Sequence, residues 1–426
     1  MALTILVSVM LITLIFGMPV AWSLGVSSMA ALIAQGIDLQ MLPQKMFSGM
    51  DRFTLLCVPF FALAGNIMAR GGITDRLLKF AVICVGWIRG GLALANVVAS
   101  MLFGGISGSA LADATALGTV EIPMMVKSGY DRRFSAAVTA ASACIGPIIP
   151  PSGIVIVYAM AVRNISIAAM FAAGMLPGII IGLALMATCY CISVRRNYPK
   201  SEIKMSLWEV MTGIKDAILA LMTPVIILGG IIGGIFTPTE AAVIAVVYSF
   251  IIAFFVYKEL KFSDLPKVFF ESAMLAAIIM IIIGTANVFG IIVAFERITE
   301  TLEIWLRPLG YFAFISATIA IFLIVGMFMD QAPAILILGP VLAPIAVSLG
   351  IEPHHYGVIV IMNLVIGLLT PPMGQVLFVI SPIAKVPFAE LVKEVFIFML
   401  VEMGVLLLVS YVPFICLWIP KLFGLL

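Results

Sequence analysis

Two stretches of nine residues, Ile145-Gly-Pro-Ile-Ile-Pro-Pro-Ser-Gly153 and Ile366-Gly-Leu-Leu-Thr-Pro-Pro-Met-Gly374, lie 221 residues apart in the chain. Each contains two consecutive prolines, which lack backbone N–H donors and block the preceding helical turn. The flanking glycines allow the backbone to leave helical geometry. Because both stretches lie within long apolar segments, each predicts a helix that is broken near its centre and leaves carbonyl groups free.

The same offset of 221 residues relates other positions, which indicates an internal duplication. The matched residues are glycine, proline and asparagine, which coincide by chance in apolar sequence less often than leucine or valine. The pairs are Asn66 with Asn287, Gly105 with Gly326, Gly118 with Gly339, Pro123 with Pro344 and Gly129 with Gly350. The sequence therefore predicts two repeats, 1–213 and 214–426.

The composition is that of an integral membrane protein. Hydrophobic residues make up 63% of the chain, charged residues make up 10%, and the mean hydropathy is +1.25. Soluble domains are about 45–50% apolar and about 25% charged. Apolar runs long enough to cross a bilayer follow one another along nearly the whole chain. No Lys/Arg cluster is interleaved with aromatic residues, so no nucleic-acid partner is expected.

Two basic loops predict the orientation of the repeats. Their basic residues are Arg195, Arg196, Lys200, Lys204, Lys215, Lys258, Lys261 and Lys267. Two predicted spans, 216–236 and 238–257, separate the loops, and the positive-inside rule assigns both loops to the cytoplasm. The next span, 268–292, then runs outward, whereas its repeat partner, 53–70, ends at basic residues and runs inward. The two repeats are therefore expected to have inverted topology.

Each repeat is expected to contain about five transmembrane helices and one re-entrant hairpin with a glycine-rich tip. The hairpins cover about 90–128 and 309–350, and the broken helices cover 131–160 and 353–382. A short amphipathic arm helix precedes each hairpin and suits the membrane interface. The predicted fold class is an all-α integral membrane protein.

Each hairpin tip faces a predicted break and carries groups that can bind a hard cation. The tip of hairpin 1 is rich in glycine and hydroxyl groups, and the tip of hairpin 2 carries Asp330. Clustered carbonyls and hydroxyls without His or Cys favour Na⁺ over a transition metal, and the N-terminal ends of half-helices favour an anionic substrate group. Asp113 and Asp330 are the intramembrane acids expected to face the ligand. The alternative is that Pro and Gly only kink the helices for packing.

Several of these motifs resemble the large membrane subunit of tripartite ATP-independent periplasmic (TRAP) transporters. The motifs are Gly105-Ile-Ser-Gly-Ser-Ala-Leu-Ala-Asp113, Ile145-Gly-Pro-Ile-Ile-Pro-Pro-Ser152, Thr237-Pro-Thr-Glu-Ala241 and Leu369-Thr-Pro-Pro-Met-Gly374. The resemblance covers essentially the whole chain. It implies a multi-pass protein of the bacterial inner membrane that works by a sodium-driven elevator motion, with Na⁺ as the coupling ion and no cofactor. The implied partners are a small membrane subunit, in a heterodimer surrounded by membrane lipid, and a periplasmic substrate-binding protein.

The resemblance also assigns residues to two sodium sites and a substrate site. Sodium site 1 would use Ser107, Gly108, Ser109, Gly146 and Pro150. Sodium site 2 would use Gly326, Met329, Asp330, Gly367, Thr370 and Met373. The small organic anion would lie near Asn66, Ser109, Ser152, Asn287 and Gln375. The overall likeness is closest to members that carry sialic acid (N-acetylneuraminate), and a C4-dicarboxylate is the alternative substrate.

Other classes of membrane protein fit the sequence less well. An intramembrane serine protease is the enzymatic alternative, because Gly105-Ile-Ser-Gly108 spells G-x-S-G. Its serine would need a base within hydrogen-bond reach, and the only two histidines, His354 and His355, are predicted in an outer loop. The chain is therefore not expected to be an enzyme. An ATP-driven pump is disfavoured because the sequence has no G-x-x-x-x-G-K-[ST] loop, and paired tips favour alternating access over a channel.

Overall fold

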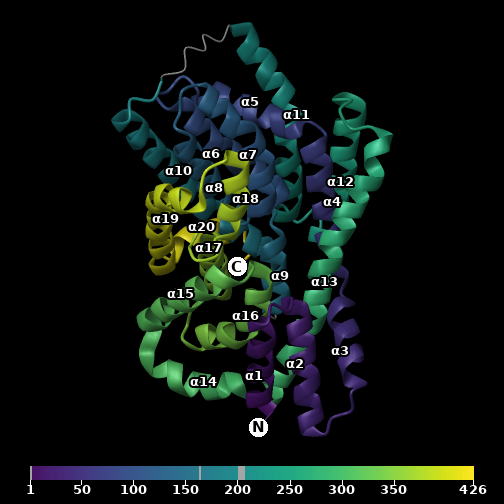
Figure 1. The fold of residues 1–426 in the computed structure, drawn as a ribbon. Coiled ribbons are helices and arrows are strands. Elements are labelled where there is room, and N and C mark those ends of the chain that lie inside the picture. The colour runs from purple at the N-terminus through teal and green to yellow at the C-terminus, as the bar shows by residue number, and fades with distance from the viewer. Residues whose placement is uncertain (1, 163–164, 200–206) are drawn as a thin grey trace.

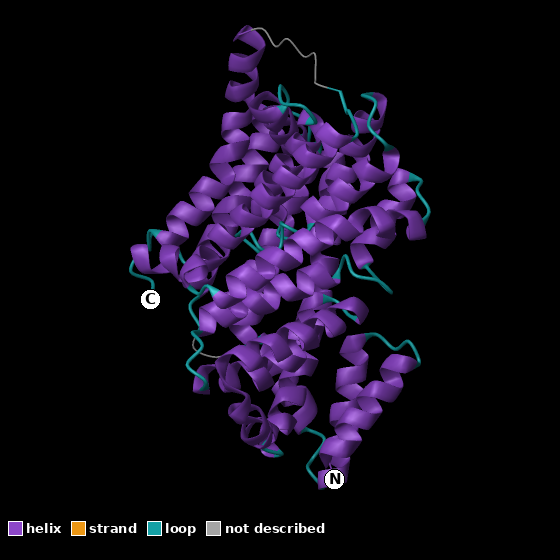
Figure 2. Ribbon diagram, turned by 90° about the vertical axis from the view of Figure 1, so that its left-hand side faces the viewer, coloured by secondary structure: helices purple, strands orange, loops and turns teal. Residues whose placement is uncertain are grey.

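The computed structural model describes residues 2–162, 165–199 and 207–426, and the regular elements in these ranges are all helices (Figure 2). An all-helical architecture satisfies the backbone polar groups within each segment, as a lipid environment requires. The all-α fold expected from the sequence is confirmed. Lys200 and Lys204 of the predicted basic loop lie outside the described residues.

One group of helices, called the frame here, packs along one side of the molecule. Within it α2 and α3 pack on α13, α4 packs on α12 and α13, and α1 packs on α2. In Figure 1, α13 runs along the right-hand side down to α3. The frame consists of α1 (Ala2–Ile15), α2 (Val20–Gln35), α3 (Met41–Met50), α4 (Cys57–Arg70), α11 (Leu207–Ile232), α12 (Pro238–Ile251) and α13 (Leu265–Phe295).

Helices α4 and α13, which are repeat equivalents, run in opposite directions. Arg70 at the end of α4 forms an ion pair with Glu271 near the start of α13, with 2.7 Å between the charged atoms. One turn away, the Asn66 amide donates to the Ser272 hydroxyl at 2.8 Å. Because the end of one helix meets the start of the other, the pair is antiparallel, as inverted repeats require.

The hairpins, the broken helices and the helices that follow them form a second group, called the body here. Its chain order is the same twice: a hairpin of two helices, a broken helix, and a long helix. The first set is α6 (Gly91–Ser107), α7 (Ala110–Lys127), α8 (Arg132–Ala143), α9 (Gly153–Ala161) and α10 (Ile167–Arg195). The second set is α15 (Gly310–Phe328), α16 (Gln331–Ser348), α17 (Pro353–Gly367), α18 (Gln375–Ala384) and α19 (Phe388–Tyr411), followed by α20 (Phe414–Leu422).

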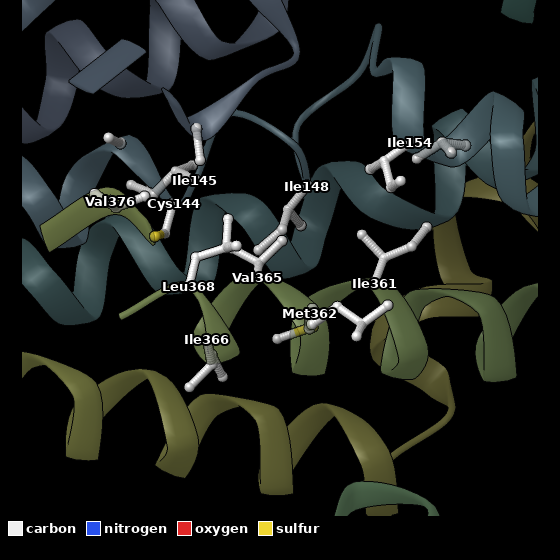
Figure 3. Close-up of a cluster of buried hydrophobic side chains, with 14 of the residues drawn as sticks. Cys144, Ile145, Ile148, Ile154, Ile361, Met362, Val365, Ile366, Leu368 and Val376 are labelled. Atoms are coloured by element: carbon white, nitrogen blue, oxygen red, sulfur yellow. The ribbon is translucent and has the colours of Figure 1, made fainter. Parts of the chain in front are cut away.

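The two broken helices pack against each other at their breaks. The first break lies between α8 and α9, and the second lies between α17 and α18. Figure 3 shows Cys144 and Ile148 of the first facing Val365 and Leu368 of the second, and all four side chains are buried. Apolar packing therefore holds both breaks together at the centre of the body.

Length and apolar composition identify only part of the predicted spans in the described ranges as single unbroken helices. In the described ranges, seven helices are long and apolar enough to cross a bilayer, or eight if α19 and α20 count as one bent span. Helices α1 and α2 have only 14 and 16 residues, and the broken helices are divided into shorter halves, whereas a straight crossing needs about 20 residues. The predicted boundary at 213/214 falls within the helix α11, and the division into two repeats at that point stays a prediction.

Two short arm helices, α5 (Ile73–Val85) and α14 (Ile298–Leu306), connect the frame to the hairpins at opposite ends of the molecule (Figure 1). The Arg76 guanidinium of α5 donates to Glu259 at 2.7 Å and stacks on the Tyr257 ring at 3.6 Å. Just before α14, the Gln35 amide donates to Glu296 at 2.6 Å. Arm α5 is thus fixed to the frame near the point where it begins, whereas the Gln35–Glu296 bond joins α2 to the end of α13, from which the chain continues into α14.

A buried hydrogen-bond network ties hairpin 1 to its broken helix. Asn96 of α6 donates to Thr139 of α8 at 2.7 Å and accepts from Ser142 at 2.7 Å, and Ser100 donates to Ser142 at 2.9 Å. None of the four residues is more than 1% exposed. Satisfied buried networks of this kind specify one arrangement of the helices that they join. Hairpin 1 and α8 therefore form one rigid unit.

We expect Asn96→Leu to destabilise the protein by about 2 kcal/mol, because it removes the partner that joins two buried hydroxyls. Thermal unfolding of the purified complex in detergent measures this effect. Thr301→Ala is the matched control, because it removes an exposed hydrogen bond within α14. If Asn96→Leu unfolds at the same temperature as the control, the network does not hold the unit together.

Candidate functional site

Hairpin 1 turns at Gly108 and rests on the first break. Gly108 has a φ of +60°, which side chains rarely adopt, and a Cβ there would stand 2.8 Å from the carbonyl oxygen of Pro151. A Cβ on Gly105 would stand 3.2 Å from the carbonyl oxygen of Pro150. The glycine pattern therefore lets the tip approach the free carbonyl groups of the break.

The carboxylate of Asp113 lies at the same contact. One of its oxygens accepts a hydrogen bond from the Ser107 hydroxyl. The other oxygen packs beside Gly146, is buried, and has no hydrogen-bond partner among the described residues. The Ser152 hydroxyl is fully buried and equally without a partner there. Leaving buried polar atoms unpaired costs free energy, so the contact has oxygen atoms available for a ligand.

Hairpin 2 makes the equivalent contact with the second break. A Cβ on Gly367 would stand 2.6 Å from the carbonyl carbon of Gly326, so the two backbones touch where no side chain fits. Asp330 is the N-cap of α16, and its carboxylate accepts from the backbone N–H of Gln331 at 2.8 Å. The Thr370 hydroxyl, at the second break, donates to the Ile366 carbonyl at 2.8 Å. This contact also brings a carboxylate, a hydroxyl and broken-helix backbone into one region.

The two contacts carry one carboxylate each, but at positions that the repeat does not relate. At the offset of 221, Asp113 corresponds to Ala334, and Asp330 corresponds to Ser109. Hairpin 1 therefore supplies its acid from the second helix of the hairpin, and hairpin 2 supplies it from the tip. The sequence singled out both acids, but the Ser107–Asp113 bond and the approach of Gly104 to Gly146 were not predicted from it. The Gly104-Gly105 pair was the signal available for that approach.

The donor set at both contacts fits a hard monovalent cation. It consists of carboxylate, hydroxyl and carbonyl oxygens, which are ligands for ions such as Na⁺ rather than for soft metals. Within the described ranges, no group of three or more His, Cys, Asp or Glu residues could hold a metal ion. The unpaired oxygens of Asp113 and Ser152 are the atoms that a cation at the first contact would engage.

The predicted substrate residues do not all lie together. Ser109 caps α7 and accepts from the Ala112 N–H at 3.4 Å, Ser152 lies at the first break, and Gln375 begins α18 after the second break. Asn66 instead bonds to Ser272 within the frame. Asn287 donates to the Lys45 carbonyl at 2.8 Å, which ties α13 to α3. The geometry gives these two asparagines a role in helix packing, and their contact with substrate stays a prediction.

The serine of the G-x-S-G stretch is not paired with either histidine. The Ser107 hydroxyl donates to Asp113. His354 instead bonds to Glu352 at 2.6 Å, and His355 bonds to the Val409 carbonyl at 2.9 Å. Both histidines lie in the first turn of α17, whereas the break follows the last turn of this helix. Ser107 therefore acts within the tip contact.

A membrane-spanning frame, two hairpins and two broken helices that meet at a buried centre define a secondary transporter, not an enzyme. Residues 7–415 match the family described as "Tripartite ATP-independent periplasmic transporter, DctM component". The chain belongs to this family of large TRAP permeases and is a multi-pass protein of the bacterial inner membrane.

Characterised relatives carry names with several substrates. The chain is 39% identical to the C4-dicarboxylate TRAP transporter large permease protein DctM of Pseudomonas aeruginosa, over 94% of each chain. It is 40% identical to the sialic acid TRAP transporter large permease protein SiaM of Vibrio cholerae, over 96% of each chain. It is 39% identical to the isethionate permease DctMQ of Oleidesulfovibrio alaskensis, over 94% of this chain and 63% of that one.

Two solved transporters share the fold at low sequence identity. The YdaH transporter of Alcanivorax borkumensis superposes with a TM-score of 0.60 and 14% identity, covering 87% of this chain and 88% of that one. MtrF of Neisseria gonorrhoeae superposes with a TM-score of 0.63 and 14% identity, covering 89% and 83%. At this identity the likeness establishes the fold alone.

Proposed function

We propose that the chain is the sodium-coupled, substrate-translocating subunit of a TRAP importer for a small organic anion. The observation that carries this proposal is the pair of tip–break contacts, each with a carboxylate beside backbone freed from helical bonding. The carboxylate of the first contact, Asp113, is fully buried, and that of the second, Asp330, is exposed. Sodium site 1 would use Ser107, Gly108, Ser109, Gly146 and Pro150, together with Asp113. Sodium site 2 would use Gly326, Met329, Asp330, Gly367, Thr370 and Met373. Each ion entering with the membrane potential would contribute about 2.3 kcal/mol per 100 mV.

The proposed motion is that of an elevator, in which the body moves against the frame. Three features support it. The arm α5 is fixed to the frame by Arg76, hairpin 1 and α8 form one rigid unit, and the two breaks pack on each other inside the body. A body with these internal contacts can move as one piece and carry both ion sites with it.

The proposed substrate is N-acetylneuraminate, and the second candidate is a C4-dicarboxylate. Relatives named for sialic acid and for C4-dicarboxylates are 40% and 39% identical to the chain, so overall similarity does not separate the two candidates. Both substrates are carboxylates, which a site at half-helix N-termini beside bound cations would favour. Ser109, Ser152 and Gln375 are the proposed polar contacts.

The proposed partners are a small membrane subunit and a periplasmic binding protein that delivers the substrate. Two relatives support the first partner, because this chain covers only 63% and 67% of the permeases DctMQ and SiaT. The additional length of those permeases leaves room for a fused small subunit. The binding protein is proposed from the family, whose description includes the word periplasmic.

The experiment is uptake of labelled N-acetylneuraminate into proteoliposomes that hold the heterodimer. We expect uptake to require both an inward sodium gradient and the cognate binding protein, and to fall to background when sodium is replaced by choline. Sodium-dependent uptake of succinate without uptake of N-acetylneuraminate would identify a C4-dicarboxylate as the substrate. Uptake that does not depend on sodium would contradict the proposal that the two contacts bind sodium ions.

A further inference from the structure

A large cavity lies between the frame and the body, away from both tip–break contacts. Its volume is about 650 Å³, and its lining comes from α3 and α13 on the frame side and from α9 and α16 on the body side. Of the lining residues, only Arg52 and Asn287 have polar side chains. Engineered apolar cavities of about 150 Å³ stay dry and bind benzene. A cavity of this size and lining therefore suits an apolar ligand.

The rim of the cavity is also apolar and opens to the outside of the molecule. Phe295 at the end of α13 is 57% exposed, and Val347 at the end of α16 is 48% exposed. In a membrane-spanning protein, exposed large apolar side chains at a cavity mouth face lipid rather than water. The ligand would therefore enter from the bilayer.

The charge at the cavity selects the kind of lipid. Arg52 is exposed, and its guanidinium forms no hydrogen bond or ion pair with any described residue, whereas its backbone bonds to Met50 and Leu55. One N–H of the Asn287 amide already donates to the Lys45 carbonyl, and Arg52 is the charged donor among the lining residues. An unpaired guanidinium beside an apolar cavity matches a phosphate head group attached to an acyl chain. The basic loops lie at the other end of the frame, so this is the outer side of the membrane.

We propose that this cavity binds an anionic phospholipid of the outer leaflet, with an acyl chain along α13 and α16 and the phosphate on Arg52. The proposal names one occupant because charge and apolar volume occur together, whereas a small organic anion would leave most of the lining unsatisfied. The cavity is bounded by the frame on one side and the body on the other, so any displacement of the body changes its shape. That consequence rests on the proposed elevator motion, whereas lipid binding itself does not.

The test uses the heterodimer in bilayers that contain phosphatidylglycerol with a photoactivatable acyl chain, and maps the crosslinked peptides by mass spectrometry. We expect crosslinks on the peptides of α13 and α16 that line the cavity. Gly290→Leu fills the cavity at a position where an added Cβ meets nothing within 4 Å, and it should remove these crosslinks. Gly404→Leu is the matched control on α19, because its added Cβ also meets nothing within 4 Å.

A second variant tests the charge. Arg52→Gln should reduce the preference for photoactivatable phosphatidylglycerol over phosphatidylcholine roughly fivefold at the cavity peptides, which corresponds to one basic side chain at a membrane surface. Crosslinks that persist in Gly290→Leu, or an equal yield from both lipids in the wild type, would overturn the proposal. Crosslinks that form in the isolated chain but disappear in the heterodimer would show that the small subunit covers the mouth of the cavity. That result would also overturn the proposal. None of these readouts requires transport.

Discussion

Gly367→Ala is expected to abolish most sodium-dependent uptake, whereas Gly326→Ala is expected to weaken it. A Cβ on Gly367 would stand 2.6 Å from the backbone of Gly326, and a Cβ on Gly326 would stand 3.3 Å from the backbone of Gly367. The first distance requires the tip to move away from the break, and the second requires a shift of only a few tenths of an ångström. Overpacking of this kind costs about 2 kcal/mol. If that cost appears in ion binding, the sodium concentration for half-maximal uptake rises roughly thirtyfold.

The measurement is initial uptake against sodium concentration for both variants, with the amount of folded heterodimer determined by size-exclusion chromatography. Gly404→Ala provides the control for a glycine replacement in a helix of the body, because an added Cβ there meets nothing within 4 Å. The sodium concentration for half-maximal uptake should be highest for Gly367→Ala and lower for Gly326→Ala. The control should require the same sodium concentration as the wild type. Equal curves for Gly367→Ala and the control would mean that the tip–break contact does not form the ion site.

The parts of the fold that depend on backbone chemistry could be predicted from the sequence. Pro150-Pro151 and Pro371-Pro372 predicted both breaks, because proline cannot continue a helix, and the structure interrupts a helix at each. The hairpins could also be predicted from the sequence, because glycine-rich stretches such as 104–108 indicate tight turns. The short helices α3 and α20 were not expected, since each has fewer residues than a membrane crossing needs.

Side-chain partners were harder to predict, as Asn66 and Asn287 illustrate. The family resemblance assigned both to the substrate site, and that assignment stays a prediction. Asn66 bonds to Ser272 and Asn287 bonds to the Lys45 carbonyl. The sequence identified the polar residues at depth, but their partners depend on how α4 and α13 pack in three dimensions.

Asp113 and Asp330 allow the charge of each proposed ion site to be removed separately. Asp113 has one oxygen bonded to Ser107 and one without a partner among the described residues, and Asp330 accepts from the Gln331 N–H. Asparagine keeps the size of either side chain and removes its charge. Removing one partner of a buried ionic contact costs about 3 kcal/mol. We therefore expect Asp113→Asn, at the buried carboxylate, to raise the sodium requirement of its site by about 100-fold. Asp330→Asn, at the exposed carboxylate, is expected to raise the sodium requirement of the second site by a smaller factor.

The shape of the sodium curve distinguishes a lost ion site from general damage. With two coupled sites, wild-type uptake should rise sigmoidally with sodium, because binding at one site affects binding at the other. In Asp113→Asn only one site fills in the accessible range, so the curve should become hyperbolic, whereas Asp330→Asn should shift a sigmoidal curve to higher sodium. Glu121→Gln is the control, because Glu121 is equally buried on α7 and lies two turns from Asp113. If Glu121→Gln changes the curve as Asp113→Asn does, any buried charge on α7 matters and Asp113 is not an ion ligand. If both aspartate variants keep the sigmoidal curve and only lose rate, neither carboxylate binds the coupling ion, and the tip–break contacts serve packing alone.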